Sequence, residues 1–132
     1  MTILCPVDFS ASSAALVGFA ATLAGAAGSE LRLLHVCEPA EAGATPQDCP
    51  AHLARLQVAA GQAGAAHVST DLLRGEAAAT IVAEARHRHA DLIVIGAHGQ
   101  TGLSRFLMGN TAEAVLRTAP CPTLLVREPA GK

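Results

Sequence analysis

The stretch between residues 96 and 111 carries the residue types best suited to holding an anion. It reads GAHGQTGLSRFLMGNT. Glycines lack a Cβ and let backbone N–H groups approach a ligand closely. Gly109 directly precedes an expected helix, whose first turn offers unpaired N–H donors and the positive end of the helix dipole. The loop can therefore cradle a phosphate, although the Walker pattern GxxxxGK[ST] does not occur and Lys132 is the chain's one lysine.

A purely structural interpretation of the same stretch stays open. The glycines can simply permit turns. Asn110 and Glu113 have the spacing of a capping box, in which Asn110 is the N-cap and Glu113 the N3 residue. Such a box occupies donors that a phosphate needs.

Two other residues near expected strand ends can contact a ligand. Asp8 follows the first apolar run, where it either contacts a ligand or caps the helix that comes next. His98 can polarise a phosphate, but no partner carboxylate is evident, which favours a hydrogen-bonding or solvated role. We expect no catalytic residue and no enzyme, because neither a lysine nor paired carboxylates accompany the loop.

The four cysteines, Cys5, Cys37, Cys49 and Cys121, contain no CxxC pattern, and no Cys/His pair has zinc-binding spacing. We therefore expect buried free thiols and no metal site. Cys49 falls in an expected loop over residues 38–50, and His35, on an expected strand, is assigned to packing.

Apolar runs and helical periodicities alternate along the chain and predict the elements that position these residues. The expected strands cover residues 2–7, 31–37, 67–73, 91–96 and 122–127, and the expected helices cover 10–27, 52–64, 76–88 and 110–118. In the first helix the spacing predicts that Leu16, Phe19, Ala20, Leu23 and Ala27 form the buried stripe. This pattern predicts one α/β domain over residues 1–132, a three-layer, doubly wound, five-stranded parallel sheet. Ligands of such sheets bind beyond the carboxyl ends of the strands.

Composition excludes several kinds of partner. The 132 residues are 51% hydrophobic, yet they contain no Trp or Tyr and three Phe, and the net charge is −2. Stacking surfaces for nucleic acids and flavin sites need aromatic rings, and phosphate tracking needs a basic stripe. Residues 9–29 carry no charge, but Ala, Gly, Ser and Thr dominate them, so we expect a buried helix rather than a membrane span or signal peptide. The expected location is the cytoplasm.

Taken together, these motifs resemble the universal stress protein family. The resemblance rests on Gly96-x2-Gly99-x9-Gly109 followed by a small polar residue, on PVDFS at residues 6–10, on His35-Val36 and on APCP at residues 119–122. It covers the chain from about residue 2 to residue 127. It implies strand order 3-2-1-4-5, an adenine nucleotide α-hydrolase-like fold and a homodimer formed through the last strand.

The resemblance also implies ATP as the ligand, with or without Mg²⁺, and a role in stress response by binding. Asp8 and Val36 occupy the positions that hold the adenosine part in ATP-binding members, and Gly96, His98, Gly99, Gly109 and Thr111 those that hold ribose and phosphates. The full set of expected binding residues is Pro6, Val7, Asp8, Val36, Ile95, Gly96, His98, Gly99, Gly109, Asn110 and Thr111. Asn110 departs from the family pattern of Ser or Thr, although its amide can donate to a phosphate. The alternative is a nucleotide-free dimeric interaction module of the same fold, and an ATP-hydrolysing enzyme ranks last.

Overall fold

Strands and helices alternate along the chain, and the computed structural model describes residues 1–8, 13–37, 48–96 and 111–126. Its strands are β1 (Thr2–Pro6), β2 (Glu30–Cys37), β3 (His67–Arg74), β4 (Leu92–Gly96) and β5 (Thr123–Val126). Its helices are α1 (Ser13–Ala27), α2 (Asp48–Gln62) and α3 (Ala77–His87), followed by a helical segment at residues 111–118.

The five strands form one parallel sheet in the order β3-β2-β1-β4-β5. The predicted fold class and strand order are confirmed. The chain first adds β2 and β3 on one side of β1 and then crosses over to add β4 and β5 on the other side. This reversal between β1 and β4 is the place where doubly wound sheets bind ligands.

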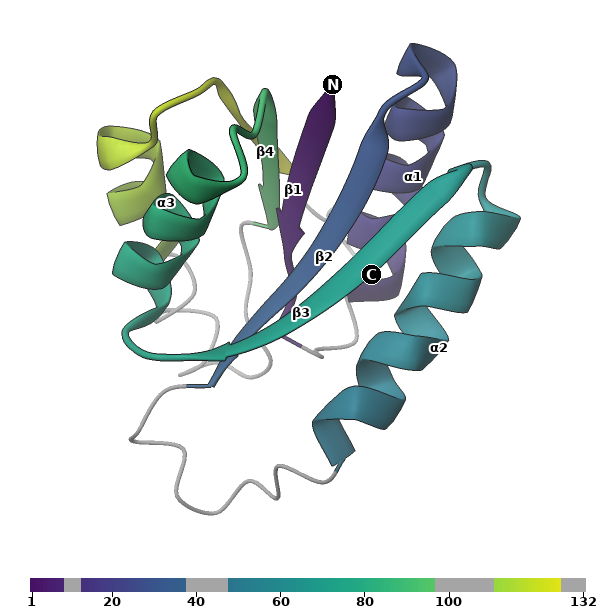
Figure 1. Ribbon diagram of the computed structural model, residues 1–132, viewed down its shortest axis with the longest axis horizontal. Coiled ribbons are helices and arrows are strands. Elements are labelled where there is room, and N and C mark those ends of the chain that lie inside the picture. Colours follow the sequence, from purple (N-terminus) through teal and green to yellow (C-terminus); the bar gives the residue numbers. More distant parts are fainter. Residues whose placement is uncertain (9–12, 38–47, 97–110, 127–132) are drawn as a thin grey trace, which may run out of the picture.

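Helices cover both faces of the sheet (Figure 1): α1 and α2 lie on one face, and α3 and residues 111–118 lie on the other. The side chains of consecutive residues in a central strand therefore enter two different cores, one on each face of the sheet. Leu33 packs with α1 and α2, Leu34 packs with α3, and both are fully buried. Burial on two faces explains why these strands read as continuous apolar runs rather than alternating ones.

The buried stripe of α1 differs from the predicted one. Phe19 is 45% exposed and Ala27 is exposed as well, so these two assignments are wrong. The side chains that are buried are Ser13, Leu16, Val17, Ala20, Ala21 and Ala24. Because α1 contains no charged residue, its sequence has no polar face from which the buried side can be predicted. Most of the residues that it buries are small. Within the described part of the chain, no helix combines the length and apolar character needed to cross a membrane.

Helix boundaries follow local chemistry. Gly28 ends α1 at φ +65°, and Ser29 N donates to Ala24 O at 2.9 Å, as in a Schellman motif with Gly28 as the C′ residue. By contrast, α2 begins at Asp48, so Cys49 and Pro50 belong to its first turn and not to the predicted loop. Proline is tolerated there because the first-turn N–H groups have no partner within the helix.

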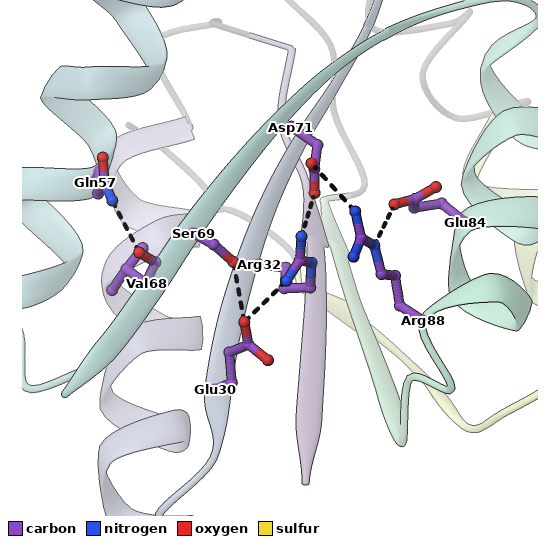
Figure 2. A network of polar contacts seen from close by, with 8 residues as sticks. All are labelled: Glu30, Arg32, Gln57, Val68, Ser69, Asp71, Glu84 and Arg88. Atoms are coloured by element: carbon purple, nitrogen blue, oxygen red, sulfur yellow. Dashed lines mark hydrogen bonds and ion pairs between the residues drawn. The ribbon is translucent and has the colours of Figure 1, made fainter.

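A network of charged side chains joins β2, β3 and α3 (Figure 2). Arg32 on β2 contacts Glu30 at 2.9 Å and Asp71 on β3 at 3.0 Å. Arg88, which follows α3, contacts Asp71 at 3.7 Å and Glu84 at 2.8 Å. The hydrogen bond to Glu84 raises the pKa of Arg88. This network ties the edge strand β3 to the rest of the sheet.

Candidate functional site

The carboxyl ends of β1, β2 and β4 bring the predicted strand-end residues to one edge of the sheet. Val7 continues the pairing beyond β1, since its N–H donates to Leu34 O on β2 at 2.8 Å. Asp8 comes next. Gly96 ends β4, which pairs with β1 through Ile3 and Leu92 and through Leu4 and Ile93. The structure therefore places Asp8, which follows β1, and Gly96, the last residue of β4, at the carboxyl ends of neighbouring strands where the strand order reverses.

Asp8 is tied to the start of α1. Its Oδ1 accepts a hydrogen bond from Ser13 Oγ at 3.2 Å, and Ser13 is buried in the first turn of the helix. This contact was not predicted, although a serine five residues after an aspartate at a strand-to-helix turn is a usable signal. Asp8 itself is half-buried. Its carboxylate is thus held in a fixed direction at the edge of the sheet.

The other predicted residues of this edge are mostly buried. Val36 is 8% exposed, and Ile95 is fully buried. Both lie in the core cluster under α3, which also contains Ala112 and Val115 from the helical segment. That segment therefore packs beside the ends of β2 and β4, and Thr111 at its start is half-buried. Pro6 and Val7 are buried too, with Val7 in the opposite cluster under α1 and α2.

A left-handed backbone conformation does not explain why residue 96 is a glycine. It is not among the described glycines with a left-handed φ. A Cβ built on it would meet Leu16 Cδ2 at 3.5 Å, which is ordinary van der Waals contact. The fold itself therefore accepts a methyl group here.

Four predicted binding residues lie outside the described part of the chain: His98, Gly99, Gly109 and Asn110. The predicted capping box is described only in part, because Asn110 is one of these four residues. Glu113 belongs to the described residues and faces solvent, where its Oε2 lies 3.6 Å from Arg117 Nη2.

His35 also lies at this end of the sheet. The sequence predicts only a packing role for it. Its ring is 6% exposed, and its Nδ1 lies 2.9 Å from Val7 O. A carbonyl oxygen only accepts hydrogen bonds, so Nδ1 is the donor in this contact. The imidazole thus connects the end of β2 to the residue that precedes Asp8.

Comparison with known proteins identifies a family model that matches most of the chain and curated relatives that match about half of it. The sequence model of the universal stress protein family matches residues 1–127. A universal stress protein of Methanocaldococcus jannaschii is 47% identical over 62 residues, which are 47% of this chain and 36% of that protein. The matched segments span less than half the length of such curated relatives.

Solved structures share the fold over almost the full length. A universal stress protein in complex with cAMP has a TM-score of 0.79 at 24% identity, covering 96% of each chain. A universal stress protein from Archaeoglobus fulgidus in complex with dAMP has a TM-score of 0.75 at 24% identity, covering 95% of this chain and 96% of that one.

Proposed function

Because the chain belongs to the universal stress protein family, we propose that it binds an adenine nucleotide at the carboxyl edge of its sheet. ATP is the first candidate. The observation that carries this proposal is the placement of Asp8 and Gly96 at the carboxyl ends of the neighbouring strands β1 and β4, where the strand order reverses. The Asp8 carboxylate, which accepts from Ser13, and Gly96, which has no side chain to obstruct a ligand, therefore lie at the same end of the sheet.

The two related structures support the adenine part of the proposal. Their ligands, cAMP and dAMP, share an adenine base, a sugar and a phosphate on its 5′ oxygen. In this chain, aliphatic groups and backbone hydrogen bonds around Val36 and Ile95 would hold the base, since Trp and Tyr are absent. The glycine loop and the start of the helical segment would hold the phosphates, and Mg²⁺ would bind with them.

Calorimetric titration of nucleotide-stripped protein with ATP tests the proposal. We expect saturable heat at one nucleotide per chain, and parallel titrations with dAMP and cAMP measure how much of the affinity comes from the adenosine monophosphate part. Each is run with and without Mg²⁺. The absence of heat for all three nucleotides, at high protein concentration, would overturn nucleotide binding.

A pair of matched variants locates the site. Asp8→Asn removes the charge but keeps an oxygen that can accept from Ser13, so we expect weaker binding in a folded protein. Asp91→Asn makes the same change just before β4, at the amino-terminal ends of the strands. There, Asp91 Oδ2 accepts from Thr2 N at 2.8 Å. Equal binding losses in both variants would argue against a role for Asp8 in the ligand site.

We also propose a homodimer formed through β5. This strand is an edge of the sheet, and Leu124 and Leu125 on it are 37% and 38% exposed. An exposed apolar edge invites pairing with a second copy. Sedimentation at micromolar concentration should give the dimer mass, Leu125→Glu should give the monomer, and Val58→Glu on exposed α2 should leave the dimer intact. A monomeric unmodified chain would contradict this assignment.

The cellular role that fits is a cytoplasmic one in stress response, by binding rather than by turnover. The hydrogen bond between Ser13 and Asp8 favours one alternative, a nucleotide-free interaction module, because it already engages the carboxylate. In that case ATP leaves the melting temperature unchanged.

Phosphate release above a protein-free blank, abolished by Asp8→Ala, would instead indicate an ATP-hydrolysing enzyme.

A further inference from the structure

Three metal-binding side chains converge on the α2 side of the sheet, near the carboxyl end of β2. They are His35 and Cys37 on β2 and Cys49 in the first turn of α2. One ligand atom from each lies within 4.8 Å of the other two. His35 and Cys49 are buried and Cys37 is half-buried. We call these three residues the His-Cys-Cys cluster.

The fold explains why these residues meet. His35 and Cys37 are two residues apart on a strand, so both side chains leave the same face of the sheet. That face is the one that α2 covers, since Leu53 of α2 packs in a core cluster with Leu33 of β2. Cys49 precedes Leu53 by four residues and therefore lies on the same side of α2.

The hydrogen bond of His35 orients the ring for metal binding. Nδ1 donates to Val7 O at 2.9 Å, so the lone pair of the neutral imidazole is on Nε2. Histidines that ligate metals commonly make this kind of contact, donating from the other ring nitrogen to a carbonyl or carboxylate, which fixes the tautomer.

We propose that the His-Cys-Cys cluster binds a thiophilic metal ion, with Zn²⁺ as the best match. Two thiolates and an imidazole are soft and borderline ligands, which suit Zn²⁺ and not Mg²⁺ or Ca²⁺. Two thiolates also neutralise a divalent ion, so the filled site brings no net charge into a buried position. Binding releases the two thiol protons to solvent.

The spacing is compatible with tetrahedral coordination. Zinc bonds of about 2.3 Å to sulfur and about 2.0 Å to nitrogen place neighbouring ligand atoms about 3.5–3.8 Å apart. The ligand atoms of the cluster, all within 4.8 Å of one another, need to close by at most about 1.3 Å. Three protein ligands leave the fourth position to water or an external ligand, as in zinc sites that are not purely structural.

The metal site and the proposed nucleotide site meet at the carboxyl end of β2 but use different faces of the sheet. Val36, between His35 and Cys37, packs in the core on the opposite face of the sheet, under α3. The metal would fix the end of β2 to the start of α2 and, through His35, to Val7. Metal binding can be tested on nucleotide-free protein, so failure of metal binding and failure of ATP binding are distinguishable.

Titration with Co²⁺ is the direct test, on the full chain, metal-free and kept reduced without oxygen. We expect one Co²⁺ per chain, a thiolate-to-cobalt charge-transfer band in the near ultraviolet and the intense visible bands of tetrahedral cobalt. Zn²⁺ should displace the cobalt and raise the melting temperature. Cys37→Ser and Cys49→Ser should each weaken binding at least about tenfold, whereas Cys121→Ser, which removes a thiol outside the cluster, should leave it unchanged.

Zinc protection provides a readout that needs no variant. In the unmodified chain, Zn²⁺ should slow alkylation of Cys37 and Cys49 but not of Cys121, as measured by mass spectrometry. The proposal fails if no charge-transfer band appears, or if the band survives in both Cys37→Ser and Cys49→Ser. It also fails if the isolated protein holds a Cys37–Cys49 disulfide and binds no metal after reduction.

Discussion

Arg32 and Asp71 connect β2 to the edge strand β3, with Arg32 Nη2 3.0 Å from Asp71 Oδ2. Their side chains are 14% and 18% exposed, so solvent screens the pair far less than a surface ion pair. Asp71 also lies 3.7 Å from Arg88, which makes it the carboxylate shared by two guanidinium groups (Figure 2). Removing its charge leaves Arg32 partly buried without its cross-strand partner.

Asp71→Asn should therefore lower the free energy of unfolding by about 1–3 kcal/mol, measured by urea denaturation. Glu113→Gln is the control, because Glu113 and Arg117 are 70% and 72% exposed and such pairs contribute about 0.5 kcal/mol or less. Equal effects of the two substitutions would show that the Arg32–Asp71 contact adds no more than a surface pair.

Gly25 lies where α1 meets the turn after α2. A Cβ built on it would be 3.0 Å from the carbonyl carbon of Gly64 and closer still to the carbonyl oxygen. Backbone cannot move aside as a flexible side chain does, so Gly25→Ala should destabilise the protein by about 1–3 kcal/mol. The measurement is the urea midpoint together with the melting temperature.

Gly18→Ala is the matched control for Gly25→Ala, in the same helix. Among the described residues, no heavy atom outside its chain neighbours and the surrounding helix backbone lies within 4 Å of a Cβ built on Gly18. Alanine is the better helix former by about 0.5–1 kcal/mol, so this variant should be more stable than the unmodified chain. Stabilisation by both substitutions would contradict close packing at Gly25.

The architecture is readable from the sequence because the sheet is buried on both faces. Runs such as residues 92–96 are apolar throughout, and the helices between them have a different period. The order 3-2-1-4-5 came from the family resemblance and not from the periodicity. The sequence does not predict which face of α1 is buried, because the helix has no charged residue to mark its solvent side. Phe19 is the largest side chain in the helix, yet it lies on the exposed side.

The candidate site was predictable only in part. Asp8 and Gly96 stand out because they follow apolar runs, and parallel strands bring their carboxyl ends to one edge. The His-Cys-Cys cluster was not predicted, since His35-x-Cys37 is a signal only once it is known to lie on a strand. The Pro-, Gly- and Ala-rich composition of residues 38–50 predicts a loop that includes Cys49, whereas Cys49 and Pro50 stand in the first turn of α2, where proline is tolerated.

Cys5 predicts how stability depends on alkaline pH. Complete burial of this β1 thiol raises its pKa from 9.0 to about 12 by desolvation. The unfolded chain therefore loses the Cys5 proton above about pH 9 while the folded chain keeps it, so ionisation favours unfolding. The free energy of unfolding should fall by up to about 1.4 kcal/mol per pH unit from this group between pH 9 and 12.

Urea denaturation of the unmodified chain and of Cys5→Ala at a series of pH values isolates this contribution. The difference in unfolding free energy between the two proteins should be constant below about pH 8.5 and should shrink as the pH rises beyond 9. A difference that stays constant up to pH 11 would mean that the folded chain ionises Cys5 as readily as the unfolded one.

Gly96 allows a separation of folding from ligand binding. A methyl group there meets Leu16 at an ordinary 3.5 Å, so Gly96→Ala should change the free energy of unfolding by less than about 1 kcal/mol. If a nucleotide lies against the end of β4, the same methyl group projects from the backbone that the ligand must approach, and ATP affinity should fall at least about tenfold, or 1.4 kcal/mol. Calorimetry and urea denaturation of the same preparation measure both quantities. Unchanged ATP affinity in a folded Gly96→Ala protein would place the nucleotide away from β4, and Asp8→Asn would then report whether it contacts the end of β1 instead.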